Sequence, residues 1–111
     1  MNAKQLKKAI ESEIGSSGEE RNLHGQTPRS GLIEPRQITV IERLVKNGKT
    51  QDHLEKVWLV FVEGPQEGDG YRIVASLDGK EFGLASQGFP KDQHLVMCGW
   101  YGDFMSTFRG M

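Results

Sequence analysis

Two short dipeptides, Asn47-Gly48 and Asp78-Gly79, constrain the fold of this chain most strongly. Each lies between segments rich in β-branched and aromatic residues, and each is a strong signal for a two-residue β-hairpin turn. The first turn sets Ile41 opposite Leu54 and Glu42 opposite His53 along the ladder. The sequence therefore predicts an antiparallel sheet built from consecutive hairpins.

The second hairpin predicts two further strands on the same principle. It pairs Ala75 with Phe82 and Ile73 with Leu84, and it leaves Arg72 on a face expected to contact water. A wide turn at 64–70, rich in Gly, Pro and Asp, connects the two hairpins, and a fifth strand is expected at 95–101 after a connection through Gly88, Phe89 and Pro90.

Helices are expected at both ends of the chain. Residues 3–14 carry apolar side chains at helical spacing and end at Gly15, while Asp103 is a cap for a short helix with Phe104 and Phe108 on one side. The predicted fold is α+β in two layers: an N-terminal helix, a five-stranded antiparallel meander sheet and a short C-terminal helix. We expect a single domain over 1–111, with a flexible loop at 15–36.

Composition argues against several classes of function. The chain of 111 residues has 14 Lys plus Arg against 15 Asp plus Glu, so no net field favours nucleic acid as a partner. The longest apolar run is far too short to cross a membrane, and no export signal is visible. The single cysteine, Cys98, forms no internal disulfide, is expected in the core, and fits the reducing cytoplasm.

Catalytic motifs are lacking, so no catalytic residue, cofactor or metal is assigned, and a role as an enzyme is not favoured. His24 and His94 are interpreted as solvated side chains outside any metal-binding spacing. The remaining constellation is Glu42, His53 and Glu55, which share one sheet face and have the chemistry for a divalent metal or a proton transfer. An exposed patch of ion pairs explains the same trio.

Apolar residues on both faces of strand 57–62 point to an interaction surface. Alternation places Val57, Leu59 and Phe61 on one face. The second face is expected to carry Ile41, Leu54, Trp58, Val60 and Val62. Either the C-terminal helix covers this second face, or another chain does.

The favoured function is a small non-catalytic protein-interaction or regulatory domain, such as an inhibitor or immunity-like binder. Its partner is expected to be a second copy in a homodimer, or another protein. The alternative is a metal-dependent or small-ligand-binding protein that uses Glu42, His53 and Glu55, or an aromatic pocket. Such a pocket is expected between helices and sheet, lined by Trp100, Tyr101 and Phe104.

Overall fold

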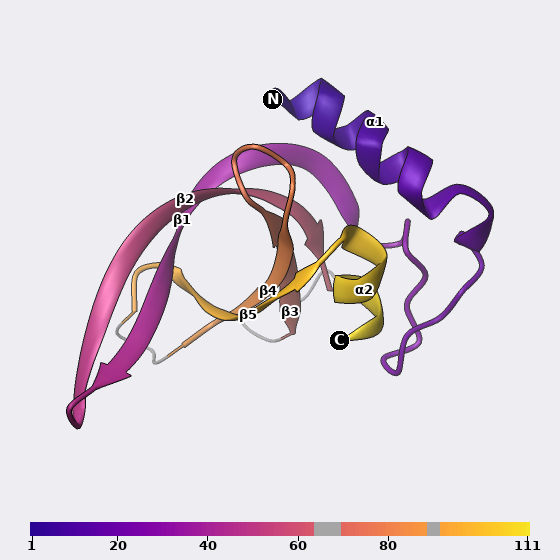
Figure 1. Ribbon diagram of the computed structural model, residues 1–111. Helices are drawn as coiled ribbons and strands as arrows, with labels where there is room; N and C mark the ends of the chain where they lie inside the picture. Colours follow the sequence, from indigo (N-terminus) through magenta and orange to yellow (C-terminus); the bar gives the residue numbers. More distant parts are fainter. Residues whose placement is uncertain (64–69, 89–91) are drawn as a thin grey trace.

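The computed structural model describes residues 1–63, 70–88 and 92–111 and confirms the predicted α+β order of a helix, five strands and a short helix (Figure 1). Most of the predicted turn at 64–70 lies outside the described residues. Phe89 and Pro90, in the predicted connection to the fifth strand, lie outside them as well. The elements are α1 (Ala3–Ile14), the 3-10 turn η1 (Gly15–Ser17), β1 (Leu32–Lys46), β2 (Lys49–Val62), β3 (Tyr71–Ala75), β4 (Phe82–Ser86), β5 (Leu95–Gly102) and α2 (Phe104–Arg109).

The sheet differs from the predicted open layer because it closes into a barrel of five strands. Four antiparallel pairings follow the chain from β1 to β5, and a short parallel pairing between β1 and β5 completes the circle. The parallel pairing joins Val40 to Leu95 and Ile41 to Val96. The long curved β1 and β2 make this possible, since they wrap around the other three strands (Figure 1).

Both hairpin registers are confirmed. Ile41 lies opposite Leu54 and Glu42 opposite His53, around a turn in which Asn47 and Gly48 have φ of 53° and 72°. In the second hairpin Ala75 pairs with Phe82 as predicted, although Asp78 lacks the positive φ that a two-residue type I′ turn requires. There the amide of Gly79 donates to the carbonyl of Ser76.

Closure of the barrel changes the environment of the sheet faces. One apolar cluster draws on all five strands and therefore fills the barrel interior; its buried members are Val40, Val57, Leu59, Val74 and Ala85. The face of β3 that was expected to contact water is therefore partly interior, because Val74 is fully buried there.

A β-bulge corrects the predicted alternation in β2. Leu59 pairs with Val74 and Phe61 with Ile73, so Val60 is an extra residue on the β2 side. After the bulge the faces exchange: Phe61 joins Trp58 and Val60 in the outer cluster, and Val62 packs against the interior cluster. Assigning Phe61 with Leu59, and Val62 with Trp58, was therefore wrong.

Both helices cover the same outer face of the barrel. Leu6, Ile10 and Ile14 of α1 and the aromatic residues of α2 pack in the cluster that contains Trp58 and Phe61. Figure 1 shows α1 and α2 on one side of the strands. The helices are joined by the Glu13 carboxylate, which accepts hydrogen bonds from the backbone amides of Phe104 and Met105 at 3.2 and 2.7 Å.

The predicted loop at 15–36 is shorter in the structure, because β1 already begins at Leu32. Its side chains contact several elements. Arg29 forms an ion pair with Glu11 of α1, and Glu20 forms one with Arg109 of α2, each at 2.8 Å. Pro28 is among the fully buried side chains. These contacts attach the segment to both helices.

Cys98 is exposed, which corrects the expectation that it belongs to the core. Its Sγ lies 3.3 Å from the hydroxyl of Ser86 on the neighbouring strand β4. The sequence around it is apolar, but alternation along β5 turns Met97 toward the interior cluster and Cys98 away from it. Within the described ranges, no helix is long and apolar enough to cross a membrane.

Candidate interaction surface

The β1–β2 hairpin projects beyond the barrel as a two-stranded arm, which we define as residues 42–56. All residues from 44 to 56 are exposed. The β1–β2 turn forms the tip of the arm and lies on the opposite side of the molecule from α1 (Figure 1). The molecule measures 45 × 29 × 23 Å, an elongated shape to which the arm contributes. A ribbon of two strands exposed on both faces buries little apolar surface of its own.

Three large apolar side chains of the arm are exposed. Val45 retains 76% of its accessible surface, Leu54 64% and Leu44 49%. Along β1, Leu44 alternates with Val45, so the two project from opposite faces of the ribbon. Such side chains at a projecting site are suited to contact another molecule.

Ion pairs support the base of the arm. The Arg43 guanidinium binds the carboxylate of Asp52 across the hairpin at 2.8 Å and that of Asp92 at 3.0 Å. The Asp92 side chain is only 7% exposed. Since Asp92 precedes β5, this pair joins the arm to the segment that leads into the closing strand.

The structure separates the five predicted interaction residues. Leu54 is exposed on the arm, while Ile41 at its base is buried. Trp58 is 8% exposed and Val60 is fully buried, both in the cluster under the helices. Val62 is partly buried against the barrel interior. Of these five positions, Leu54 is the one that offers a large exposed apolar side chain.

The trio considered for metal or proton chemistry lies along one face of the arm. Glu42 and His53 are cross-strand neighbours, as predicted. Glu42, however, accepts a hydrogen bond from the indole Nε1 of Trp100 at 2.8 Å. Across the described ranges there is no group of three or more His, Cys, Asp or Glu placed to hold a metal ion.

A hollow of about 520 Å³ opens at the base of the arm. Its walls include Glu42, Glu55, Glu81 and the ring of Trp100. The predicted aromatic pocket is not assembled as expected, because Phe104 of α2 is fully buried in the core and Tyr101 is exposed. Sequence reasoning did not place Trp100 beside Glu42, since the two residues are 58 positions apart.

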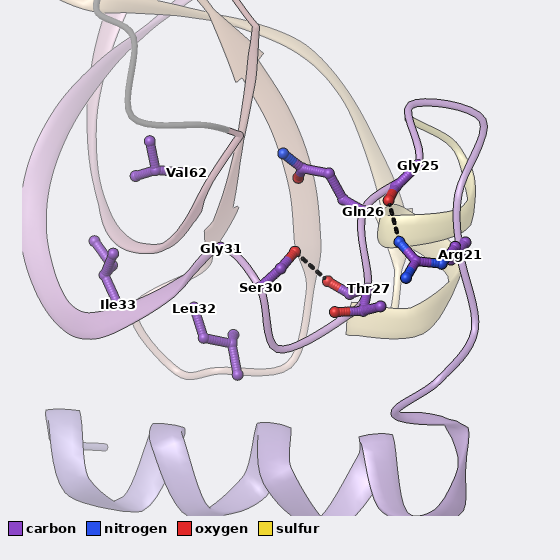
Figure 2. Close-up of a pocket in the computed structure, with 9 residues that line it drawn as sticks. All are labelled: Arg21, Gly25, Gln26, Thr27, Ser30, Gly31, Leu32, Ile33 and Val62. Carbon is purple, nitrogen blue, oxygen red and sulfur yellow. Dashed lines mark hydrogen bonds between the residues drawn. The ribbon is translucent and has the colours of Figure 1, made fainter.

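A second hollow, of about 750 Å³, lies between the loop that precedes β1 and the end of β2 (Figure 2). Glycine and aliphatic residues line it together with four polar side chains, those of Arg21, Gln26, Thr27 and Ser30. Arg21 donates to the carbonyl of Gly25 at 2.7 Å. Among the described residues, the buried side-chain oxygen Oε1 of Gln26 is the one without a hydrogen-bond partner.

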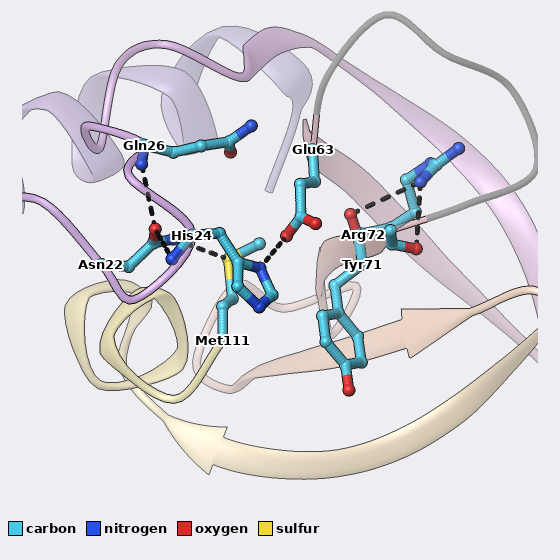
Figure 3. A network of polar contacts seen from close by, with 8 residues as sticks. Asn22, His24, Gln26, Glu63, Tyr71, Arg72 and Met111 are labelled. Atoms are coloured by element: carbon cyan, nitrogen blue, oxygen red, sulfur yellow. Dashed lines mark hydrogen bonds and ion pairs between the residues drawn. The ribbon is translucent and has the colours of Figure 1, made fainter.

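His24 is exposed, as its sequence context indicated, and it also belongs to a polar network that the sequence did not indicate. Its Nδ1 lies 2.7 Å from the carboxylate of Glu63, and its ring stacks on Tyr71 with the planes 7° apart (Figure 3). The side-chain oxygen of Asn22 accepts hydrogen bonds from the backbone amides of His24 and Gln26 and so supports the loop around His24. This network attaches the loop to the ends of β2 and β3.

Comparison with known proteins adds no functional information. No protein-family model, curated protein or solved structure gives a significant match to this chain. The functional argument therefore depends on the geometry of the arm and the hollows.

Proposed function

We propose that this chain is a small, non-catalytic protein-interaction or regulatory domain that binds its partner through the β1–β2 arm. The observation that carries the proposal is the exposure of the arm on both faces, with Leu44, Val45 and Leu54 open to solvent. A two-stranded ribbon is marginally stable by itself, so maintaining one outside the barrel is easiest to understand if it contacts another molecule.

The edges of the arm support the same proposal. β2 pairs with β3 from Trp58 onward, so in the described chain residues 53–56 have β1 as their neighbour on one side. Unpaired strand edges present backbone donors and acceptors, and extended segments of partner proteins commonly bind to them. The partner we propose is another protein or a second copy of this chain, in the cytoplasm.

The test is capture of proteins by the tagged full chain from a lysate of its source, with arm variants beside the wild type. We expect a stoichiometric protein, or untagged copies of this chain, to be captured. Val45→Ser and Leu54→Ser should abolish capture. Leu23→Ser is the matched control, because Leu23 is 93% exposed and lies outside the arm. Equal capture by the wild type and both arm variants would reject the arm as the binding surface.

A small-ligand role is the second candidate, and the hollow at the base of the arm favours it. In its wall the three carboxylates of Glu42, Glu55 and Glu81 outnumber the one cation, Lys56, and Trp100 lines it as well. This chemistry suits an organic cation. Titration with tetramethylammonium, followed by amide chemical shifts, tests this idea. A saturable change that Trp100→Leu removes supports it, and shifts that spread evenly over the molecule contradict it.

A further inference from the structure

We propose that one end of the barrel binds a small organic anion, whose carboxylate or phosphate group is held by Arg36 and Arg72. The apolar body of the ligand lies on Ile38, Leu59 and Leu95. The site is a hollow of about 390 Å³, a volume within the range of small-molecule sites. This inference goes beyond the function proposed for the arm, because it concerns a different surface and a different kind of ligand.

Strand pairing places both arginines on the interior face of the barrel. Arg36 lies directly opposite Leu59, a member of the interior cluster. Arg72 lies opposite Val62, which packs against the same cluster. Residues that lie opposite each other in an antiparallel pair project from the same face of the sheet. Alternation agrees for Arg72, because it is two positions from the fully buried Val74. Both arginines therefore line one hollow where the barrel interior opens.

The positive charge of this hollow is not neutralised within the described chain. Arg36 and Arg72 line it, and no carboxylate is among its described lining residues. Neither arginine forms an ion pair with a carboxylate in the part of the chain that the structure describes. Nη1 of Arg72 donates to the carbonyls of Gly70 and Tyr71 at 3.3 and 3.5 Å (Figure 3). A guanidinium has five N–H donors, so its other nitrogens can bind a ligand.

The lining suits an oxyanion that carries an apolar body. Guanidinium groups match the oxygens of carboxylates and phosphates and bind them through paired hydrogen bonds. Three further lining residues have side chains that can donate hydrogen bonds: Thr39, Gln93 and His94. The apolar part of the wall consists of Ile38, Leu59 and Leu95, which belong to the interior cluster or pack against it. Small-molecule sites commonly combine such an apolar wall with a few polar groups at the mouth of a barrel.

The sign of the charge distinguishes this hollow from the acidic one at the base of the arm. β1 and β3 run in the same direction, because each is antiparallel to β2. Glu42 of the acidic hollow follows Arg36 along β1, and Ser76 of the same hollow follows Arg72 just beyond β3. The two hollows therefore lie toward opposite ends of the barrel. An organic cation should discriminate against the hollow that Arg36 and Arg72 line.

Titration of the full chain, followed by amide chemical shifts, tests the inference with probes that differ in one part each. Hexanoate and hexyl phosphate carry both an oxyanion and an apolar chain, and each should give saturable shifts that cluster at Leu59, Arg72 and Leu95. The tighter of the two identifies the preferred head group. Acetate lacks the chain and hexanol lacks the charge, so each should bind at least about tenfold more weakly. Hexylammonium should give no saturable shift at these amides.

Variants of the two arginines test the same site from the side of the protein. Arg36→Gln and Arg72→Gln should each weaken hexanoate binding at least about fivefold, because each removes a charged donor. Neither residue is buried, so the wild-type amide spectrum should be retained. Arg21→Gln is the matched control, since it removes the same charge from a different hollow and should leave hexanoate binding unchanged.

Three results would overturn the inference. The first is the absence of a saturable shift with both hexanoate and hexyl phosphate. The second is wild-type affinity for hexanoate in both Arg36→Gln and Arg72→Gln. The third is a loss of affinity in Arg21→Gln as large as in these variants, which would show that net charge alone attracts the anion. None of these results affects capture of a protein by the arm, which is tested separately with Leu54→Ser.

Discussion

The indole Nε1 of Trp100 donates a hydrogen bond to Oε1 of Glu42 at 2.8 Å, and this bond joins β5 to β1 just beyond the end of their parallel ladder. The ladder between the two strands ends at Ile41 and Val96. The Trp100–Glu42 bond therefore extends the closure of the barrel toward the base of the arm.

The first prediction concerns this closure. Trp100→Phe retains an aromatic ring but removes the donor, and we expect a loss of about 1 kcal/mol in the free energy of unfolding. Urea denaturation at low protein concentration measures it. A double-mutant cycle with Glu42→Ala isolates the bond from other effects of each change. Strictly additive losses would show that the bond contributes nothing to stability.

The second prediction distinguishes a core position from a surface position on the same face of β2. Trp58→Glu should lower the free energy of unfolding by about 3 to 5 kcal/mol or abolish folding, because it places a carboxylate under the two helices. Leu54→Glu should change stability by about 0.5 kcal/mol or less, since Leu54 is exposed. Thermal unfolding of both variants decides between these environments. A stably folded Trp58→Glu protein contradicts the packing described here.

The third prediction concerns the close approach of Gly31 to β2. The carbonyl of Gly31 accepts a hydrogen bond from the backbone amide of Val62 at 2.8 Å. A Cβ atom added at position 31 would overlap the carbonyl of Val62 and the ring of Phe61. Gly31→Ala should therefore destabilise the fold by about 1 to 3 kcal/mol. Gly110→Ala is the matched control, since its Cβ would meet its nearest neighbours at 3.4 Å. Equal stability of the two variants would argue against the close contact.

The fourth prediction links Asp103 to stability in acid. The backbone amide of Ser106 donates a hydrogen bond to Oδ1 of Asp103 at 2.8 Å. This bond is the main cause, and hydrogen bonding to the Ser106 side chain the second, of a lowered pKa of the Asp103 carboxyl. A group with a lowered folded-state pKa stabilises the protein above its unfolded pKa of about 3.9. That contribution is lost as the pH falls through the folded-state pKa.

Variants at position 103 separate the cap from the charge. Asp103→Ala should cost about 1 kcal/mol at neutral pH, because the cap is lost. Asp103→Asn keeps an acceptor for the Ser106 amide but removes the titration. The stability difference between wild type and Asp103→Asn should therefore shrink between pH 5 and pH 2, within the general range of carboxyl titration. Urea unfolding across this range measures it, and a constant difference would contradict the assignment.

Local interactions explain why much of the fold could be predicted from the sequence. Asn47-Gly48 fixed the register of β1 and β2 because its positive φ angles suit a two-residue turn, and Asp103 marked the start of α2. The bounds of α1 match the predicted 3–14 because apolar spacing and Gly15 act within a few residues.

Tertiary structure alone decided what covers each face. Alternation in β2 separates two sets of side chains, but it does not reveal that both helices pack over Trp58 or that a bulge at Val60 exchanges the faces. Barrel closure brings Glu42 to Trp100 across 58 positions. Such pairings depend on the curvature of long strands and on packing between distant segments, and these are properties of the assembled fold and not of any local stretch of sequence.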